Sequence, residues 1–453
     1  MGIFGALTTA VAGLQAQSYA LENISGNIAN SQTYGFKRTE TSFKDLLIGG
    51  SFSPASQVSG SVQAYSRSTN DVQGAVQNAS SGTSIAVSGS GFFAVAQSIG
   101  DSDGLPQFAG SEVYTRRGDF EFDRNGYLVN GGGYYLKGQP LDSKTGNPVG
   151  AASPIKIAKD LFPAAATTSI AYQLNLPSKP QTANYVAGDP SSWLLDSGVG
   201  ATVTAADSDA FIDSTIEGDS LTVYDAKGEA SDLQMRWGKV SNADADATPP
   251  TTDTWALFYK SDTNATGADV EWTRVDQTYA FDDAGKLTTP ADGNVTIAGL
   301  TIDGTSFGDV KMAHGAGLTQ YGAASGAAST TELSQDGAAS GEMIGVEISD
   351  GGLVTATYSN GKTRNLYKIP LVDFPSPNQL SSLDGGAYAA TSASGAAFAS
   401  ENGAIVGQAI EQSNVDIADE FTKMIVTQQA YSANTRVVST SDTMMQETLN
   451  MIR

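Results

Sequence analysis

Helical periodicity marks the two ends of this chain, whereas short alternating stretches fill its middle. From residue 414 to 453 there is neither Pro nor Gly, and apolar or large side chains recur at spacings of three and four. This is the period of a long helix whose apolar stripe needs a helical partner. The stripe consists of Ile417, Phe421, Met424, Tyr431, Val438, Met445, Leu449 and Ile452.

Residues 1–30 follow the same rule. Neither helix is expected to be ordered alone, because the backbone entropy lost on ordering exceeds what the stripe returns by burial. We therefore expect the two ends, 1–30 and 408–453, to pack on each other or on copies of themselves as a helical coiled-coil domain. Two amphipathic helices folded onto one globular core would give the same pattern. The first stripe consists of Phe4, Leu7, Val11, Leu14, Leu21 and Ile28.

Between the helices the sequence predicts β structure in nested domains. Residues 31–74, rich in Ser, Gly, Gln and Thr, suit an extended connector. Short strands separated by turns predict an inner β domain over 75–150 and 318–407, and an acidic stretch over 151–317 predicts an inserted outer β domain. The predicted fold class is mostly β with long N- and C-terminal α-helices, in a nested multidomain chain.

Several predicted hairpins have an Asp and a Gly in the turn. Phe120–Phe122 and Tyr127–Val129 flank the turn Asp123–Gly126, and Asp282 begins a similar turn. Asp123 and Asn125 could suggest a calcium loop, but the run has no closing acidic residue. A plain hairpin is therefore the favoured interpretation.

Composition narrows the function classes. The formal net charge of -23 disfavours nucleic acid and anionic membranes as partners, and no apolar run is long enough to insert into a membrane. Cys is absent, so disulfides and thiolate metal sites are excluded. The single His, His314, lies in a Gly- and Ala-rich stretch and is expected on a surface loop. No catalytic, cofactor-binding or metal-binding residue is predicted. A surface glycosidase is the enzymatic alternative, but no motif singles out two carboxylates.

The N-terminus lacks the features of a cleaved signal peptide. No Lys or Arg precedes Lys37, and Gly, Thr and Gln interrupt the apolar run. We expect either a cytosolic protein or one that is exported by a route without such a signal.

Several stretches together resemble one family, the bacterial flagellar rod and hook axial proteins. Residues 84–95, with 114–120 and 126–130, resemble the inner β domain of that family, and 413–434 resembles its C-terminal helix. The long middle of the chain is similar to hook subunits rather than to the shorter rod subunits. The N-terminal signature is matched by Asn27, Ala29, Asn30, Thr33, Gly35, Phe36 and Lys37.

The resemblance implies a structural, non-enzymatic subunit without cofactors. It would polymerise with its own copies into a curved, hollow helical tube, the flagellar hook, which acts as a universal joint between rod and filament. The terminal stripes would form the assembly interface. The implied partners are the distal rod, hook cap and hook–filament junction proteins and the flagellar type III export apparatus, and the implied location is extracellular. A distal rod subunit and a non-flagellar surface fibre or adhesin remain the alternatives.

Overall fold

The computed structural model describes residues 3–48, 58–143, 145–244, 246 and 251–451. These residues form two compact units. Unit 1 contains the described residues up to Lys159, Ile344–Thr357 and the described residues from Thr363 onward, whereas unit 2 contains Asp160–Met343 and Tyr358–Lys362. The chain is mostly β with a long helix at each end, which confirms that part of the predicted fold class.

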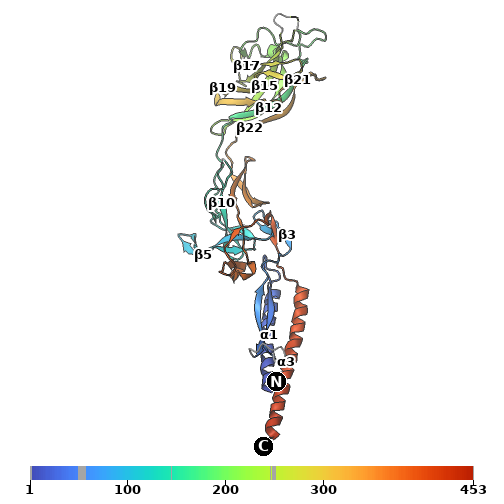
Figure 1. Cartoon of the computed structure of the whole chain (residues 1–453). Helices are drawn as coiled ribbons and strands as arrows, with labels where there is room; N and C mark the ends of the chain where they lie inside the picture. The colour runs from blue at the N-terminus through green and yellow to red at the C-terminus, as the bar shows by residue number, and fades with distance from the viewer. Residues whose placement is uncertain (1–2, 49–57, 144, 245, 247–250, 452–453) are drawn as a thin grey trace. The chain divides into compact units, whose positions relative to one another are not determined.

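The helical part of unit 1 consists of two helices and one hairpin. Helix α1 spans Ile3–Ala29, and helix α3 spans Ile417–Met451. Strands β1 (Thr39–Ile48) and β2 (Val58–Ser68) pair antiparallel and contact α1. Figure 1 shows the hairpin beside α1, with α3 next to them. The stretch for which the sequence predicted an extended connector therefore contains a paired hairpin.

A fourteen-stranded sheet forms the larger β part of unit 1. Its buried aromatic cluster includes Phe92, Tyr114 and Phe374, and the rings of Tyr114 and Phe374 meet edge to face at 4.9 Å. Its main path runs β23 (Met343–Ser349), β24 (Leu353–Tyr358), β25 (Thr363–Lys368), β10 (Tyr134–Pro140), β5 (Phe92–Ser102), β7 (Val113–Thr115), β28 (Ala387–Ala389) and β27 (Ser381–Leu383). Its side strands are β6 (Leu105–Phe108), β8 (Phe120–Phe122), β9 (Leu128–Asn130), β11 (Ser153–Pro154), β26 (Leu371–Asp373) and β29 (Phe398–Ala399).

Two short ladders connect this region to the segment before α3. Strand β3 (Val76–Asn78) pairs with β31 (Ala409–Glu411), and β4 (Ile85–Gly89) pairs with β30 (Gly403–Gly407), both antiparallel. Short 3-10 helices, η2 (Pro377–Gln379) and η3 (Asp384–Gly386), flank β27.

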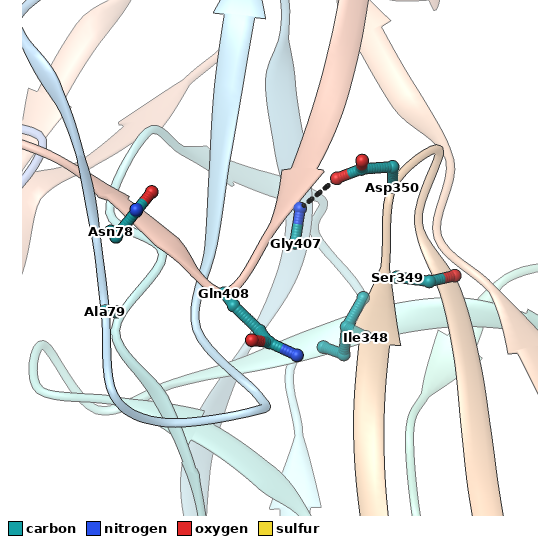
Figure 2. A pocket seen from close by; sticks show the side chains of 7 residues that line it. All are labelled: Asn78, Ala79, Ile348, Ser349, Asp350, Gly407 and Gln408. Carbon is teal, nitrogen blue, oxygen red and sulfur yellow. Dashed lines mark hydrogen bonds between the residues drawn. The ribbon is translucent and has the colours of Figure 1, made fainter.

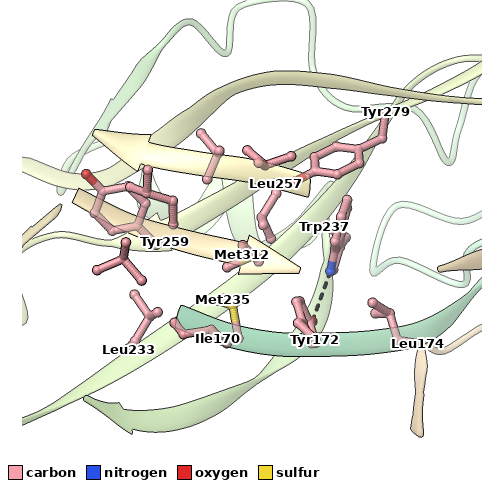
Figure 3. Packing of buried hydrophobic residues seen from close by; sticks show 14 of the residues in the cluster. Ile170, Tyr172, Leu174, Leu233, Met235, Trp237, Leu257, Tyr259, Tyr279 and Met312 are labelled. Atoms are coloured by element: carbon pink, nitrogen blue, oxygen red, sulfur yellow. Dashed lines mark hydrogen bonds between the residues drawn. The ribbon is translucent and has the colours of Figure 1, made fainter. Parts of the chain in front are cut away.

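Unit 2 packs two sheets around one apolar core. The strand β12 alternates buried and partly buried residues, which directs Ile170, Tyr172 and Leu174 into that core (Figure 3). The first sheet contains β19 (Asn294–Ile302), β20 (Thr305–Ala313), β12 (Ser169–Pro177), β21 (Thr319–Tyr321) and β22 (Ser329–Gln335). The second contains β13 (Thr202–Thr204), β17 (Val270–Phe281), β16 (Asp253–Lys260), β15 (Ala230–Ser241), β14 (Ile216–Tyr224) and β18 (Leu287–Thr289).

The strand β16 is buried on both faces. Trp255 and Leu257 belong to the core between the sheets, whereas Phe258 packs on the opposite face with Phe211 of the short helix α2 (Ser208–Asp213). Two-sided burial explains why this strand reads as a continuous apolar run rather than as an alternation.

His314 is not on the surface, and that prediction is wrong. Its side chain is fully buried in unit 2: Nδ1 donates to the Tyr172 carbonyl oxygen at 2.7 Å, and Nε2 lies 3.1 Å from the Tyr279 hydroxyl, which donates to it. Burial, opposed by the bond to the Tyr172 carbonyl, lowers the pKa of His314 from 6.5 to about 4. The Gly- and Ala-rich neighbourhood in sequence concealed these distant aromatic partners.

The hairpin predictions are confirmed, but one assignment of strands is wrong. Asp123 Oδ1 accepts the backbone N–H groups of Asn125 and Tyr127, each at 2.8 Å, and β8 pairs with β9 across this turn. Residues 318–343, however, were assigned to the inner β domain. They belong to unit 2, where β22 pairs with β12.

Candidate assembly junction

The helices α1 and α3 pack side by side in antiparallel orientation. Asn27, near the end of α1, donates to Glu420 Oε2 at 3.0 Å near the start of α3. Further along, Gly13 faces Asn434 so closely that an added Cβ would lie 2.8 Å from the Asn434 Nδ2. The two contacts fix both the direction and the register of the pair.

Small and polar residues form the contact face. The buried apolar residues of α1 are Ala10, Ala16, Ala20 and Ile24. The buried residues of α3 are Glu420, Thr427 and Ser441. Small side chains let two helices approach closely, and the fully buried positions of this pair are mostly small or polar.

The predicted stripe residues that the structure describes are either half-buried or exposed, and none is fully buried. Phe4 and Leu449 are 71% and 68% exposed. Ile452 lies outside the described residues. The other exposed stripe residues are Val11, Ile417, Phe421 and Tyr431. The half-buried ones are Leu7, Leu14, Leu21, Ile28, Met424, Val438 and Met445.

The hairpin β1–β2 is held to α1 by polar contacts. The Tyr19 and Ser66 hydroxyls are 2.7 Å apart, and Asn23 Nδ2 donates to Thr41 Oγ1 at 2.9 Å. At the base of the hairpin, Asn27 bonds both backbone groups of Thr39 at 2.9 Å, as a neighbouring strand would. One signature residue thus joins α1, β1 and α3.

The remaining signature residues shape the turn after α1. Asn30 Nδ2 donates to the Gly26 carbonyl at 2.9 Å, and its Oδ1 accepts the Thr33 hydroxyl at 3.2 Å, which closes the helix end. Gly35 has φ +66, and a Cβ there would lie 2.7 Å from the backbone nitrogen of Arg117. Only glycine satisfies both demands. Ala29 is exposed and Phe36 is half-buried on the same turn.

A buried ionic cluster follows this turn, and we call it the Glu411 junction: Lys37, Gly74, Arg116 and Glu411. The carboxylate of Glu411, 1% exposed as a residue, accepts from Lys37 Nζ at 2.5 Å, from Gly74 N at 2.8 Å and from Arg116 Nη1 at 3.3 Å. Burial lowers the pKa of Lys37, and the charge of Glu411 opposes that shift. Charge-assisted bonds of this kind hold three segments at one point.

Asn414 extends the junction toward α3. Its Oδ1 accepts the backbone N–H of Arg38 at 2.7 Å, and its Nδ2 donates to the Thr69 hydroxyl at 3.3 Å and the Val72 carbonyl at 3.1 Å. Two residues later, Asp416 accepts the N–H of Ala418 at 2.8 Å and so begins α3. The chain on both sides of the β1–β2 hairpin is therefore fastened to the segment that enters the second helix.

Sequence reasoning identified Lys37 in the signature but missed its partners Glu411 and Arg116. The sequence did contain an indication that Glu411 points inward. Glu411 follows two apolar residues in a short strand, and the residue two positions before it, Ala409, is buried. An acidic residue on the inward side of a strand requires a buried cation. Nothing in the sequence indicates which cation that is.

The described part of the chain contains neither a candidate metal cluster nor a membrane-spanning helix. No group of three or more His, Cys, Asp and Glu side chains there could hold a metal ion. None of its helices is long and apolar enough to cross a membrane.

Comparisons with known proteins agree on one family. A flagellar hook protein FlgE of Brucella suis is 30% identical over 462 residues, covering 100% of this chain and 100% of that protein. The chain belongs to the flagellar hook protein FlgE family. The FlgE of Salmonella typhimurium is also 30% identical, over 98% of each chain. A crystal structure of Helicobacter pylori flagellar hook protein FlgE2 is similar with a TM-score of 0.49 and 15% identity, over 73% of this chain and 99% of that one.

Three family models match successive parts of this FlgE-family chain. The model of the flagellar hook protein FlgE/F/G D1 domain matches 86–173, and that of the flagellar basal body protein FlaE D2 domain matches 194–338. The model of the flagellar basal body rod FlgEFG protein C-terminal region matches 406–451. Arg116 lies in the first match and Glu411 in the third. In this FlgE-family member, the Glu411 junction therefore connects the D1 and C-terminal regions.

Proposed function

We propose that this chain polymerises into the curved, hollow tube of the bacterial flagellar hook and transmits motor torque from rod to filament as a universal joint. The observation that carries the proposal is the full-length similarity to proteins named flagellar hook protein FlgE. The role is structural rather than catalytic.

The helix pair supplies a surface for polymerisation. Its contact face uses small and polar residues, so large apolar side chains such as Phe4, Phe421 and Leu449 stay exposed in the single chain. We infer that the predicted stripes pack against neighbouring copies, where each large side chain returns about 1.5–3 kcal/mol on burial. Because heterologous contacts need not close into a ring, they produce an open helical polymer.

The proposed mechanics follow from the two kinds of interface. Helices packed coaxially in an inner layer resist sliding, because interdigitated side chains must separate before they move. The β regions would lie outside this layer, where wet, weakly apolar contacts shift at low cost. A tube of this kind is stiff in torsion and soft in bending. Its partners would be the distal rod, hook cap and hook–filament junction proteins, and it would reach the cell exterior through the flagellar type III export apparatus.

Complementation of a hook-deficient strain tests the proposal. Electron microscopy of cells that express this chain should show a curved tube at the cell surface, and the cells should swim. A straight rod in its place would favour the distal rod alternative, and the absence of any polymer would contradict both.

The hairpin β1–β2 can be tested in the same strain. Replacing residues 40–67 by a Gly-Asn turn joins Thr39 to Ser68, which face each other in the ladder, and leaves the Glu411 junction intact. We expect a soluble monomer whose tryptophan fluorescence is unchanged but which forms no curved hook. A normal, motile hook from this variant would refute a role of the hairpin in the polymer.

A further inference from the structure

An open polar pocket lies near the Glu411 junction in unit 1. It has a volume of about 510 Å³. Three separate segments line it: the end of β3 with Asn78, the turn after β23 with Asp350, and the link between β30 and β31 with Gln408 (Figure 2). The first and third segments belong to the ladders that lead into α3, so this pocket lies on the part of the chain that carries the helix.

The backbone of Gln408 is unusual. Its φ is +50, and the other non-glycine residues with positive φ in the described part of the chain are all Asp. Asp and Asn tolerate this conformation because their short side chains bond the local backbone, whereas Gln does not gain in that way. Glycine would fit this link with less strain. A residue that is strained at such a position points to a use for its side chain.

The side chain of Gln408 is uncommitted. It is exposed, and its amide makes no hydrogen bond to any described residue, nor does the amide of Asn78. Asp350 uses one carboxylate oxygen to accept the Gly407 N–H at 3.0 Å, as Figure 2 shows, and its other oxygen has no partner in the described chain. The pocket therefore presents one free carboxylate oxygen and two free amides along its lining.

The charge of the lining favours a cationic occupant. Asp350 is its ionisable residue, and neither Lys nor Arg lines it. The amides of Asn78 and Gln408 add hydrogen-bond acceptors to the same lining, and an ammonium or guanidinium donates several hydrogen bonds at once. The polymer supplies such groups from a second copy, on which Lys44, Arg67 and Arg436 are exposed and form no ion pair within the described residues.

We propose that this pocket receives a Lys or Arg side chain from a neighbouring copy, with Asp350 and Gln408 as its recognition residues. The inference rests on the proposed polymerisation. It makes the pocket an intersubunit contact that is separate from the apolar stripes of the helices.

Two substitutions test the pocket, each with a matched control. Asp350→Asn removes the charge, and Asp196→Asn does the same at an exposed turn Asp that also accepts one backbone N–H, from Gly198 at 2.9 Å. Gln408→Gly removes the amide and relieves the strained φ, and Asp219→Gly relieves a φ of +64 at an exposed position away from the pocket. The measurements are the urea midpoint of the monomer and the concentration at which half of the purified chain sediments as polymer.

In the pocket variants the urea midpoint and the half-assembly concentration should respond differently. Asp350→Asn and Gln408→Gly should keep or raise the urea midpoint, yet raise the half-assembly concentration about tenfold, while the controls leave assembly unchanged. Assembly of Asp350→Asn should also depend less on salt than that of the unsubstituted chain. Unchanged assembly in both pocket variants would overturn the inference. A requirement for a divalent cation, abolished by EDTA in the unsubstituted chain but absent in Asp350→Asn, would also overturn it, by placing an inorganic ion there. Failure of the unsubstituted chain to assemble would instead contradict the proposed function.

Discussion

Substituting Glu411 by Gln removes the carboxylate that two buried cations share. Lys37 and Arg116 have side chains 1% and 2% exposed, so neither can turn to water when the charge is lost. Removing one partner of a buried ion pair costs about 3–5 kcal/mol, and the Gln oxygen can still accept one of the three bonds. We therefore expect Glu411→Gln to destabilise the region around the junction by about 3 kcal/mol.

The assay must distinguish the two units. The four tryptophans, Trp193, Trp237, Trp255 and Trp272, all lie in unit 2, so urea unfolding followed by tryptophan fluorescence should not change. Hydrogen exchange measured by mass spectrometry at increasing urea reports the ladders β3–β31 and β4–β30 directly. In these two ladders the free energy of local opening should fall by the full amount expected for the substitution, about 3 kcal/mol.

The control is Glu401→Gln, because Glu401 is exposed and forms no ion pair in the described chain. Adding Lys37→Met to Glu411→Gln should recover part of the lost opening free energy, since it removes one of the two buried cations that no longer have a carboxylate partner. An opening free energy within about 1 kcal/mol of the unsubstituted chain would refute the view that this cluster holds the segments together.

Three further predictions concern unit 2, the signature turn and the helices. The folded pKa of His314 lies below its unfolded value, so its contribution to stability is full above pH 6.5 and is lost as the pH falls toward about 4. The free energy of unfolding, measured by urea titration with tryptophan fluorescence, should drop by about 3 kcal/mol over that window, and His314→Gln should flatten the drop. Gly35→Ala should cost about 2 kcal/mol or more by hydrogen exchange at the junction, against about 1 kcal/mol for Gly133→Ala, where φ is +82 but the space is open; equal losses would contradict the close approach to Arg117. Residues 1–30 and 414–453 should exchange fast in the monomer and slowly in the polymer, and strong protection in the monomer would show that the helix pair is an autonomous domain.

Local patterns in the sequence were sufficient for the elements, because their causes are local. The absence of Pro and Gly after residue 414 indicated α3, and the Asp and Gly of the turn at Asp123 indicated its hairpin. The face of each helix was less predictable. A periodicity analysis gives most weight to large apolar residues, whereas the two helices approach closely at Gly13, which has no side chain and receives little weight.

Contacts between distant segments were not predictable from one sequence. The strand β22 was assigned to the wrong region because its partner β12 lies about 160 residues earlier and nothing local specifies it. His314 was misplaced for the same reason, since Tyr172 and Tyr279 are distant in sequence. Glu411 could have been noticed as a charged residue on an inward position, but not its pairing with Lys37.

The Glu411 junction also sets an order of events for a chain made from its N-terminus. Glu411 follows Lys37 by 374 residues and Arg116 by 295, so both cations remain without their acceptor until residue 411 has been synthesised. Contacts of such long sequence separation form late, because the intervening loop must first be closed. A chain that stops before residue 411 therefore lacks the carboxylate that fastens the segment leading into α3.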